Sequence, residues 1–162
     1  MSYPYPDKVL QHLWRCTEKN PDLYIYAILD AARNDRIYPV LANSDVEYRC
    51  LYLGKIPSVL AEAAPYLVRF HRDSSFMSWL VGEGWGDSWG IFFASPATFK
   101  ELRPHFREFM MARDEEGNTF YFRYYDPRVL RIFLPTCKTS ELKMIFGPVK
   151  YFIVEGVSFS TT

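Results

Sequence analysis

The sequence predicts an α/β fold of the α+β kind, in which one domain contains a mixed β-sheet with flanking helices and a β-hairpin in its C-terminal half. Two observations predict the sheet and the hairpin. Apolar runs typical of strands alternate with amphipathic runs typical of helices along the first two thirds of the chain. An acidic turn that ends in a glycine, residues 114–117, then separates two strand-like runs. A chain of 162 residues is long enough for one domain to bury about two thirds of its unfolded surface.

The N-terminal elements are expected to be a surface helix and a buried strand. Asp7 is suited to cap the helix, and Asn20-Pro21 ends it because proline cannot continue the hydrogen-bond ladder. The apolar face of this helix carries Val9, Leu10, Leu13 and Trp14. Residues 23–29 form a continuous apolar run with β-branched and aromatic members, which suits a strand covered on both faces. We expect this run to be the central strand.

Strands and short helices are expected to alternate through the middle of the chain. A loop and a short helix at 30–43 accommodate Pro39 only if it lies in the first turn of the helix. Ser95-Pro96 has the N-cap and first-turn chemistry of another helix, which Pro104 is expected to end. The other expected elements are strands at 47–53, 66–70 and 91–94, a weak helix at 57–63 and a helix capped by Ser74 or Ser75.

The C-terminal part is expected to begin with the hairpin, whose arms are residues 107–113 and 118–125. Asp126 then caps a helix that Pro127 opens. A last helix, which carries Leu142, Ile145 and Phe146, ends at Gly147-Pro148 and leads to a strand at 151–155. We therefore expect one domain over residues 1–155, followed by a short, polar and frayed tail at 156–162.

The charge balance excludes some partners. Lysine plus arginine and aspartate plus glutamate both number 19, and the isoelectric point is near 6.8. No overall field attracts nucleic acid or an anionic membrane. No apolar run approaches the roughly 20 residues that span a bilayer, and no signal segment precedes the domain, so we expect a cytoplasmic protein. The widely spaced Cys16, Cys50 and Cys137 are expected to be reduced, buried thiols.

Aromatic residues make up 18% of the chain, with 12 tyrosines and 13 phenylalanines. Aromatic side chains dominate the energetics of both cores and interfaces, so each of them could serve either purpose. Tyrosine is enriched at interfaces, and we expect some of these residues to face a partner.

No catalytic signature is present, and we expect no catalytic residue, no cofactor and no metal site. Residues 82–86 are glycine-rich but lie between a helix and a strand, the reverse of the order that places a helix N-terminus against phosphate. Ser88 lacks the strand-then-helix setting of a nucleophile elbow. His12, His71 and His105 lie on separate elements.

One enzymatic alternative remains open, which is a small hydrolase with an acid/base site. The carboxylates of Asp30, Asp87 and Asp126 all fall at element boundaries, where catalytic acids occur but where capping and turn roles are commoner. Such a hydrolase would use Asp30 or Asp126 beside His71, and it requires a pocket in which these groups converge.

A partner-binding patch is predicted around the helix that follows Asp126. Arg128 and Arg131 lie three residues apart, so both guanidinium groups can project from one face and bind a carboxylate. Residues 120–150 contain six basic and two acidic residues, a local balance of 6 − 2 = +4. A solvated face, or pairing with the acidic hairpin turn, explains these charges equally well. The candidate docking residues are Arg123, Tyr124, Tyr125, Arg128 and Arg131.

Five sequence blocks, in this order, resemble one known family. They are residues 26–33 (YAILDAAR), 64–68 (APYLV), 84–86 with 89–92 (GWG and WGIF), 122–130 (FRYYDPRVL) and 146–149 (FGPV). Together they are similar to the adaptor/chaperone domain of bacterial type VI secretion systems, which was first catalogued as a domain of unknown function (family 4123). The resemblance covers about residues 23–155, nearly the whole chain.

The resemblance implies a cytoplasmic protein without enzymatic activity. Such a protein binds a cognate toxic effector and helps to load it onto the valine-glycine-repeat (VgrG) spike protein, without itself being secreted. From the charge balance we expect neither nucleic acid nor a membrane as a partner. The family motifs bring no catalytic set, and none is transferred to this sequence. Family members often carry a further C-terminal lobe that helps to choose the cargo, and we expect that lobe to be absent or reduced here.

Overall fold

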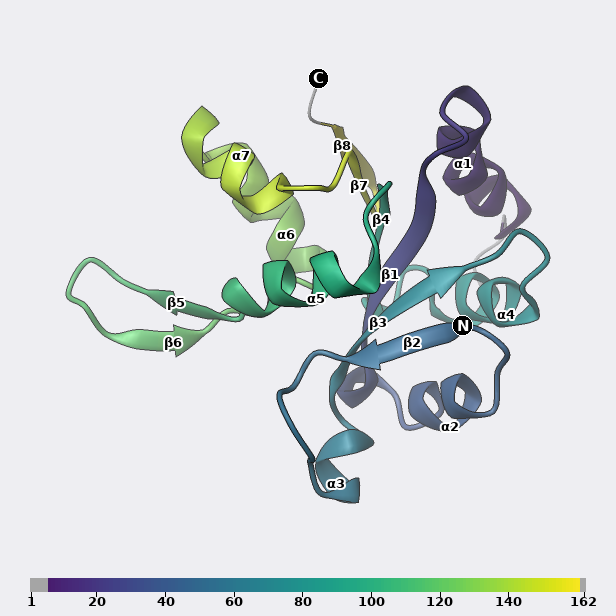
Figure 1. Ribbon diagram of the computed structural model, residues 1–162, viewed down its shortest axis with the longest axis horizontal. Coiled ribbons are helices and arrows are strands. Elements are labelled where there is room, and N and C mark those ends of the chain that lie inside the picture. Colours follow the sequence, from purple (N-terminus) through teal and green to yellow (C-terminus); the bar gives the residue numbers. More distant parts are fainter. Residues whose placement is uncertain (1–5, 161–162) are drawn as a thin grey trace.

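A six-stranded β-sheet forms the centre of the computed structural model, which describes residues 6–160 (Figure 1). The strands are arranged in the order β2-β3-β1-β4-β7-β8. Their bounds are Tyr24–Asp30 for β1, Glu47–Cys50 for β2, Pro65–Phe70 for β3, Gly90–Ser95 for β4, Tyr151–Val154 for β7 and Val157–Ser160 for β8. A separate two-stranded sheet consists of β5 (Met111–Arg113) and β6 (Thr119–Tyr121).

The predicted class, an α+β domain with a hairpin in its C-terminal half, is confirmed, but the sheet differs in one respect. We expected a mixed sheet, whereas every strand pairing among residues 6–160 is antiparallel. The central position of β1 is also confirmed, because β1 pairs with β3 on one side and with β4 on the other. Alternation of strands and helices along the chain does not decide strand direction, which depends on where each crossover ends.

Helices cover both faces of the sheet. The helices are α1 (Pro6–Lys19), α2 (Ile37–Ala42), α3 (Ser58–Ala61), α4 (Ser75–Gly84), α5 (Phe99–Glu108), α6 (Pro127–Phe133) and α7 (Thr139–Phe146), with short 3-10 turns η1 (Ala31–Arg33) and η2 (Leu134–Thr136). In Figure 1, α1, α2 and α4 lie on one side of the sheet and α5, α6 and α7 lie on the other. The fold therefore has three layers.

The continuous apolar run of β1 is explained by these layers. Successive side chains of a strand point to opposite faces. Ile25, Ala27 and Leu29 pack in the core beneath α1, α2 and α4, whereas Tyr26 and Ile28 pack in the core beneath α5, α6 and α7. Both faces of β1 are buried, and the hydroxyl of Tyr26 donates a hydrogen bond to the carbonyl oxygen of Ala97 at 2.5 Å.

Several predicted helix boundaries are confirmed. Ser74 caps α4, because its hydroxyl oxygen accepts a hydrogen bond from the amide of Met77 at 3.3 Å. Pro39 lies in the first turn of α2. Gly147 ends α7 with a φ of 48°, and the ring of His105 occupies the space that a Cβ at this glycine would need. The end of α7 thus requires both the backbone freedom and the small size of glycine.

The prediction for α5 was wrong at both ends. The helix begins after Thr98, which forms a capping box with Glu101, and Pro104 lies inside it. The hydroxyl of Ser95 is already used, since it donates to the carbonyl of Pro148 at 2.7 Å and accepts from the amide of Ala97 at 3.1 Å. Pro104 removes one amide from the ladder, but it lies on the exposed side of the helix, where water can bind the carbonyl left without a partner.

The C-terminal tail is also not frayed as predicted. Residues 157–160 form β8, which pairs with β7 and makes one edge of the sheet. Gly156, with a φ of 90°, makes the turn between these two strands, a conformation that favours glycine. Residues 161–162 of the predicted tail lie outside the described part of the chain.

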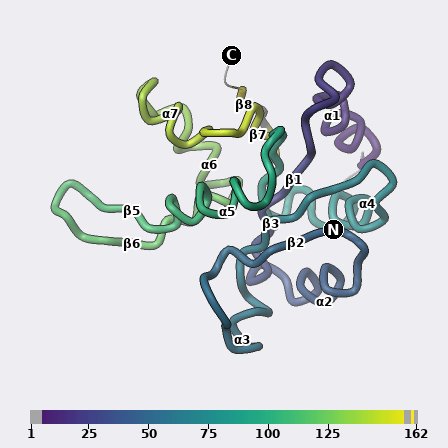
Figure 2. Tube along the Cα trace, viewed as in Figure 1, coloured from purple at the N-terminus to yellow at the C-terminus, as the bar shows by residue number. Residues whose placement is uncertain are grey.

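The hairpin is shorter than predicted and projects from the rest of the molecule. Its strands are three residues each, and β6 ends at Tyr121 rather than at residue 125. The acidic turn is confirmed, since Asp114 Oδ1 accepts hydrogen bonds from the amides of Glu116 and Asn118 at 3.0 and 2.8 Å. Figure 2 shows that the chain path of β5 and β6 extends away from the six-stranded sheet.

Two further expectations concern the burial of the cysteine thiols and the absence of membrane-spanning helices. Cys16, Cys50 and Cys137 form no disulfide, and each is half-buried, so these thiols are less buried than we predicted. Within residues 6–160, none of the helices combines the length and the apolar character that crossing a bilayer requires.

Candidate partner-binding surfaces

An apolar groove lies between the hairpin and the helices α5, α6 and α7. It encloses about 340 Å³, and most of its wall consists of aromatic and aliphatic side chains. The hairpin supplies Met111 and Phe120, α5 and the residue after it supply Phe106 and Phe109, α6 supplies Leu130 and Phe133, and α7 supplies Met144 and Ile145. This set is called the apolar groove below.

Aromatic packing holds the deep wall of the groove in place. The rings of Phe122 and Phe133 meet edge to face, with centroids 4.9 Å apart, and Tyr124 stacks on Phe106 with centroids 5.9 Å apart. These contacts fix the segment that follows β6 against both α6 and the end of α5. The wall is therefore a packed surface and not a gap that side chains can easily close.

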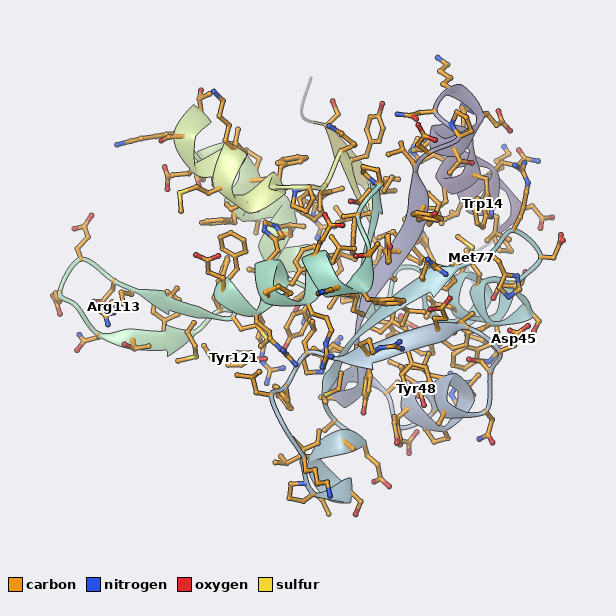
Figure 3. The ribbon with its side chains drawn as sticks, viewed as in Figure 1. Trp14, Asp45, Tyr48, Met77, Arg113 and Tyr121 are labelled. Carbon is orange, nitrogen blue, oxygen red and sulfur yellow. The ribbon has the colours of Figure 1, made fainter. Side chains whose placement is uncertain are left out.

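The rim of the groove exposes large apolar side chains to solvent. Met111 is 54% exposed, Phe120 is 46% exposed and Met144 is 63% exposed. Charged groups stand at the margins, where Arg113 and Glu141 line the groove, and Figure 3 shows Arg113 on the projecting hairpin. Contiguous exposed apolar side chains with a polar rim are typical of a protein-interaction site. Methionine and aromatic side chains also adapt well to different partners.

Two of the predicted docking residues are not on the surface. Tyr124 and Tyr125 belong to the core, with 4% and 1% of their surfaces exposed. The hydroxyl of Tyr124 donates to the carbonyl of Phe106 at 2.8 Å, and the hydroxyls of Tyr125 and Tyr121 lie 2.9 Å apart. Burial raises the pKa of Tyr125 to about 12. The prediction was wrong for these tyrosines because β6 ends at Tyr121 and the chain then turns into the core.

The three predicted docking arginines are on the surface, but each already has an internal partner. Arg123 Nη1 lies 3.4 Å from Asp30 Oδ2, and Arg128 Nη2 lies 2.7 Å from Asp126 Oδ2. Arg131 Nη1 donates to the carbonyl oxygen of Glu155 at 2.8 Å. The contacts of Arg123 and Arg131 tie the segment before α6 and α6 itself to the sheet, whereas Arg128 pairs with the residue that caps its own helix. The three arginines therefore have structural roles whether or not a partner also contacts them.

The partners of these arginines are carboxylates and a carbonyl group at one end of the sheet. Glu155 Oε1 accepts hydrogen bonds from the amides of Gly86 and Ser88 at 2.6 and 3.1 Å. The glycine-rich turn thus holds a carboxylate of this chain. Burial raises the pKa of Glu155, while these amides oppose that shift. The sequence did not single out Glu155.

A polar cavity of about 410 Å³ lies beside this turn. Arg33, Asp87 and Arg128 are among its lining residues, and Arg33 Nη2 donates to the carbonyl oxygen of Asp87 at 3.2 Å. Three of the five blocks on which the family resemblance rests contribute to this end of the sheet, through residues 30–33, 84–86 with 89, and 126–128. These blocks are far apart in the sequence but lie close together in the structure.

Two aspartates of this end of the sheet differ in the direction of their pKa shifts. Burial raises the pKa of Asp30, while the amide of Ala32 and the charge of Arg123 act against it. Burial also acts to raise the pKa of Asp126, but hydrogen bonds from Arg128 outweigh it and hold the pKa below its usual value. Asp126 has the predicted capping role, since it accepts a hydrogen bond from the amide of Arg128 at 2.9 Å.

The structure does not bring together the groups of the hydrolase alternative. Asp30 pairs with Pro65 at one end of β3, whereas His71 follows Phe70 at the other end, so six residues, or about 20 Å of extended chain, separate the two sites. His71 Nε2 lies 3.4 Å from Asp45 Oδ2, and Figure 3 shows Asp45 across the molecule from the hairpin. Within residues 6–160, no group of three His, Cys, Asp or Glu side chains is placed to hold a metal ion.

The apolar groove was not predicted from the sequence. The high aromatic content of the sequence predicted that some aromatic side chains face a partner. It did not indicate which aromatic residues these are. Phe120 and Met111 lie on short strands whose two faces cannot be assigned from so few residues. Met144 lies on the exposed side of α7, away from the side that Phe146 buries in the core, so the helical pattern gave no reason to select it.

The fold and these surfaces define a single-domain α+β protein that exposes an apolar groove beside a projecting hairpin. The family described as a domain of unknown function (DUF4123) matches residues 25–144 of the chain, which is well over half of its length. The chain belongs to this family. No curated protein and no solved structure matches it.

Proposed function

We propose that this protein is a cytoplasmic adaptor/chaperone of a type VI secretion system, which binds a cognate toxic effector and helps to load it onto the VgrG spike. One structural observation carries the proposal, namely the apolar groove with its exposed rim. The sequence resemblance supplies the biological setting, and membership of the DUF4123 family is consistent with it.

The groove has the features required to hold an apolar segment of an effector. A helix or extended stretch with two or three large apolar side chains would bury them against Phe109, Phe122 and Phe133. A few buried anchors provide most of the binding free energy in such interfaces. While bound, the apolar segment would be covered and could not aggregate with other molecules, which is what a chaperone does for its client.

The hairpin is suited to close over such a segment. A two-stranded hairpin has little stability of its own in water. Met111 and Phe120 of the hairpin both line the groove, and they are 54% and 46% exposed. A bound apolar segment would contact both the hairpin and α7, and the area buried there would stabilise the hairpin.

The test is co-expression of the protein with the product of the toxin gene next to its own gene. We expect the two proteins to co-purify, and we expect Phe120→Glu and Met144→Glu each to reduce the recovered effector at least tenfold. A charge buried in an apolar site costs several kcal/mol, and every 1.4 kcal/mol is a tenfold change in affinity.

Val59→Glu is the matched control. Val59 is also a large exposed apolar residue, but it lies on α3, which contributes no residue to the groove. Its substitution should leave the amount of effector unchanged. Failure of the unchanged protein to bind either the effector or the spike from its own host would refute the adaptor function, and equal losses in all three variants would remove the groove from it.

A further inference from the structure

A second surface lies on the other side of α5, where the sheet extends beyond the helices. By strand alternation and register, Glu47 and Arg49 of β2 and Arg69 of β3 are on the same face of the sheet as Tyr26 of β1. Helix α5 covers β1 on this face, and Figure 1 shows β2 beside the helix rather than beneath it. This part of the face carries charged side chains.

Two arginines of α5 complete this surface. Arg103 and Arg107 lie four residues apart and therefore project from the same side of the helix. Arg103 Nη2 donates to the carbonyl oxygen of Cys50 at 2.9 Å, and Arg107 Nε and Nη2 donate to the carbonyl oxygens of Leu51 and Tyr52 at 2.7 and 3.1 Å. The four residues Arg49, Arg69, Arg103 and Arg107 are called the arginine face.

The arginine face has more positive charge than its neighbours neutralise. Glu47 pairs with Arg69, but Arg49, Arg103 and Arg107 take part in none of the ion pairs found within residues 6–160. With Glu47 included, the balance is 4 − 1 = +3. Burial lowers the pKa of Arg103, and repulsion from Arg107 and Arg49 lowers it further. Arg103 therefore experiences repulsion from two like charges, and among residues 6–160 no carboxylate forms an ion pair with it.

The arginines are held in fixed positions. The guanidinium of Arg49 lies 5.0 Å from the centroid of Phe99, and Arg49 Nη1 donates to the carbonyl of Tyr48 at 2.8 Å. The guanidinium of Arg69 lies 5.0 Å from the ring of Tyr24, an exposed side chain. Stacking and carbonyl contacts orient these groups in advance, so a ligand would lose less side-chain entropy on binding.

We propose that the arginine face binds an acidic segment of a protein partner. Guanidinium groups match carboxylates in shape and bind them with paired hydrogen bonds. The overall charge of the chain is zero, and Glu47 lies within the face, so no extended positive track is present for a nucleic-acid backbone. Because α5 separates this surface from the apolar groove, the proposal goes beyond the adaptor function and does not depend on it.

The test measures binding of a fluorescent hexaglutamate peptide by anisotropy, with hexalysine and a short oligothymidylate as comparison probes. We expect the protein to bind hexaglutamate, to prefer it to the oligothymidylate, and to lose it near 1 M salt, where the Debye length is about 3 Å. Arg49→Glu should weaken binding about tenfold or more, because Arg49 is exposed and its reversal changes the local balance by two charges.

Arg72→Glu is the matched control. Arg72 is also an exposed arginine that stacks on an aromatic ring, at 5.8 Å from Trp14, but it lies away from α5 and β2. This variant should bind hexaglutamate within about twofold of the unchanged protein. The proposal fails if hexaglutamate does not bind, if both variants bind it equally, or if the oligothymidylate binds more tightly. Concentration-dependent self-association that Arg49→Glu abolishes would also overturn it, since a second copy would then be the occupant.

Discussion

The guanidinium of Arg123 reaches from the surface to Asp30, a carboxylate buried where the central strand ends. Arg123 Nη1 and Asp30 Oδ2 lie 3.4 Å apart, and the two side chains are 57% and 4% exposed. Asp30 also caps the turn that follows β1, because its Oδ1 accepts a hydrogen bond from the amide of Ala32 at 3.0 Å. One carboxylate thus links the end of the central strand to the segment that leads into α6.

The Asp30–Arg123 pair predicts unequal effects of its two neutral substitutions. Arg123→Gln should lower the free energy of unfolding by about 1–3 kcal/mol, because it leaves a buried carboxylate without its cation, and the exposure of Arg123 reduces the cost. Asp30→Asn should cost less, since the amide oxygen can keep the contact with Ala32. Urea denaturation at neutral pH measures both values.

The double variant provides the control for this pair. Once Asp30 is replaced by Asn, Arg123→Gln should have little further effect. Simple additivity of the two substitutions would show that the pair is not coupled.

The same pair predicts a pH dependence. Burial raises the pKa of Asp30, so protonation favours the folded state. The Arg123→Gln variant alone should therefore recover part of its lost stability as the pH falls through that raised pKa.

His105 predicts a loss of stability in mild acid. Its ring packs against Phe106 and Phe109, with centroids 5.0 Å away in both cases, and its Nε2 lies 2.8 Å from the carbonyl oxygen of Ile145. Burial lowers the pKa of His105 below its ordinary value of 6.5. The unfolded chain therefore binds the proton more readily, and stability should fall as the pH drops below about 6.5.

His105→Gln tests this assignment, because glutamine can donate to the same carbonyl but does not titrate. The melting temperature of the variant should decrease less than that of the unchanged protein between about pH 7 and pH 5. The raised pKa values of Asp30 and Glu155 act in the opposite direction, but they are common to both proteins. Parallel pH profiles would assign the acid sensitivity to other groups.

Asp126 predicts a separable capping effect at the start of α6. Asp126→Ala removes the oxygen that accepts from the amide of Arg128 and should cost about 1–2 kcal/mol of unfolding free energy. Asp126→Asn should cost less, because asparagine also caps helices. Chemical denaturation measures both. Equal losses would indicate that the ion pair with Arg128, rather than the cap, supplies the stability.

The ring of Tyr124 lies in the deep wall of the apolar groove, but its hydroxyl points to the backbone of α5, so loss of the hydroxyl alone should affect stability and not binding. Its hydroxyl satisfies the carbonyl of Phe106 in the last turn of α5, so Tyr124→Phe should cost about 1–3 kcal/mol of unfolding free energy. Tyr124→Ala should cost about 3–5 kcal/mol, because it also opens a cavity in the core. Effector recovered per folded molecule should be unchanged in Tyr124→Phe. A large loss of binding at unchanged stability would restore the docking role that the sequence predicted.

Local chemistry predicted the elements well where neighbouring residues decide them. Ser74 and Asp126 cap the helices that they were expected to cap, and the acidic turn at 114–117 connects two strands. The prediction failed where a distant contact intervened. Ser95 had the right residue type for a cap, but its hydroxyl binds the carbonyl of Pro148, and Thr98 starts the helix instead.

The candidate site was predicted less well than the fold. The three arginines 123, 128 and 131 were correctly placed at the surface, whereas Tyr124 and Tyr125, which stand beside Arg123 in sequence, proved to be buried. Residue type gives the capacity of a side chain to bind, but burial depends on which other elements pack against it. The apolar groove combines residues from a hairpin and three helices, and no sequence window contains them together.

The sequence by itself determined the α+β class, the two-sided burial of β1 and most caps and turns, because these depend on periodicity and on contacts between near neighbours. Only the tertiary structure decided that every strand pairing among the described residues is antiparallel, that residues 157–160 form an edge strand, and that the apolar groove and the arginine face lie on opposite sides of α5. The physical reason is that strand direction, side-chain burial and the convergence of charges are set by packing between segments far apart in the chain.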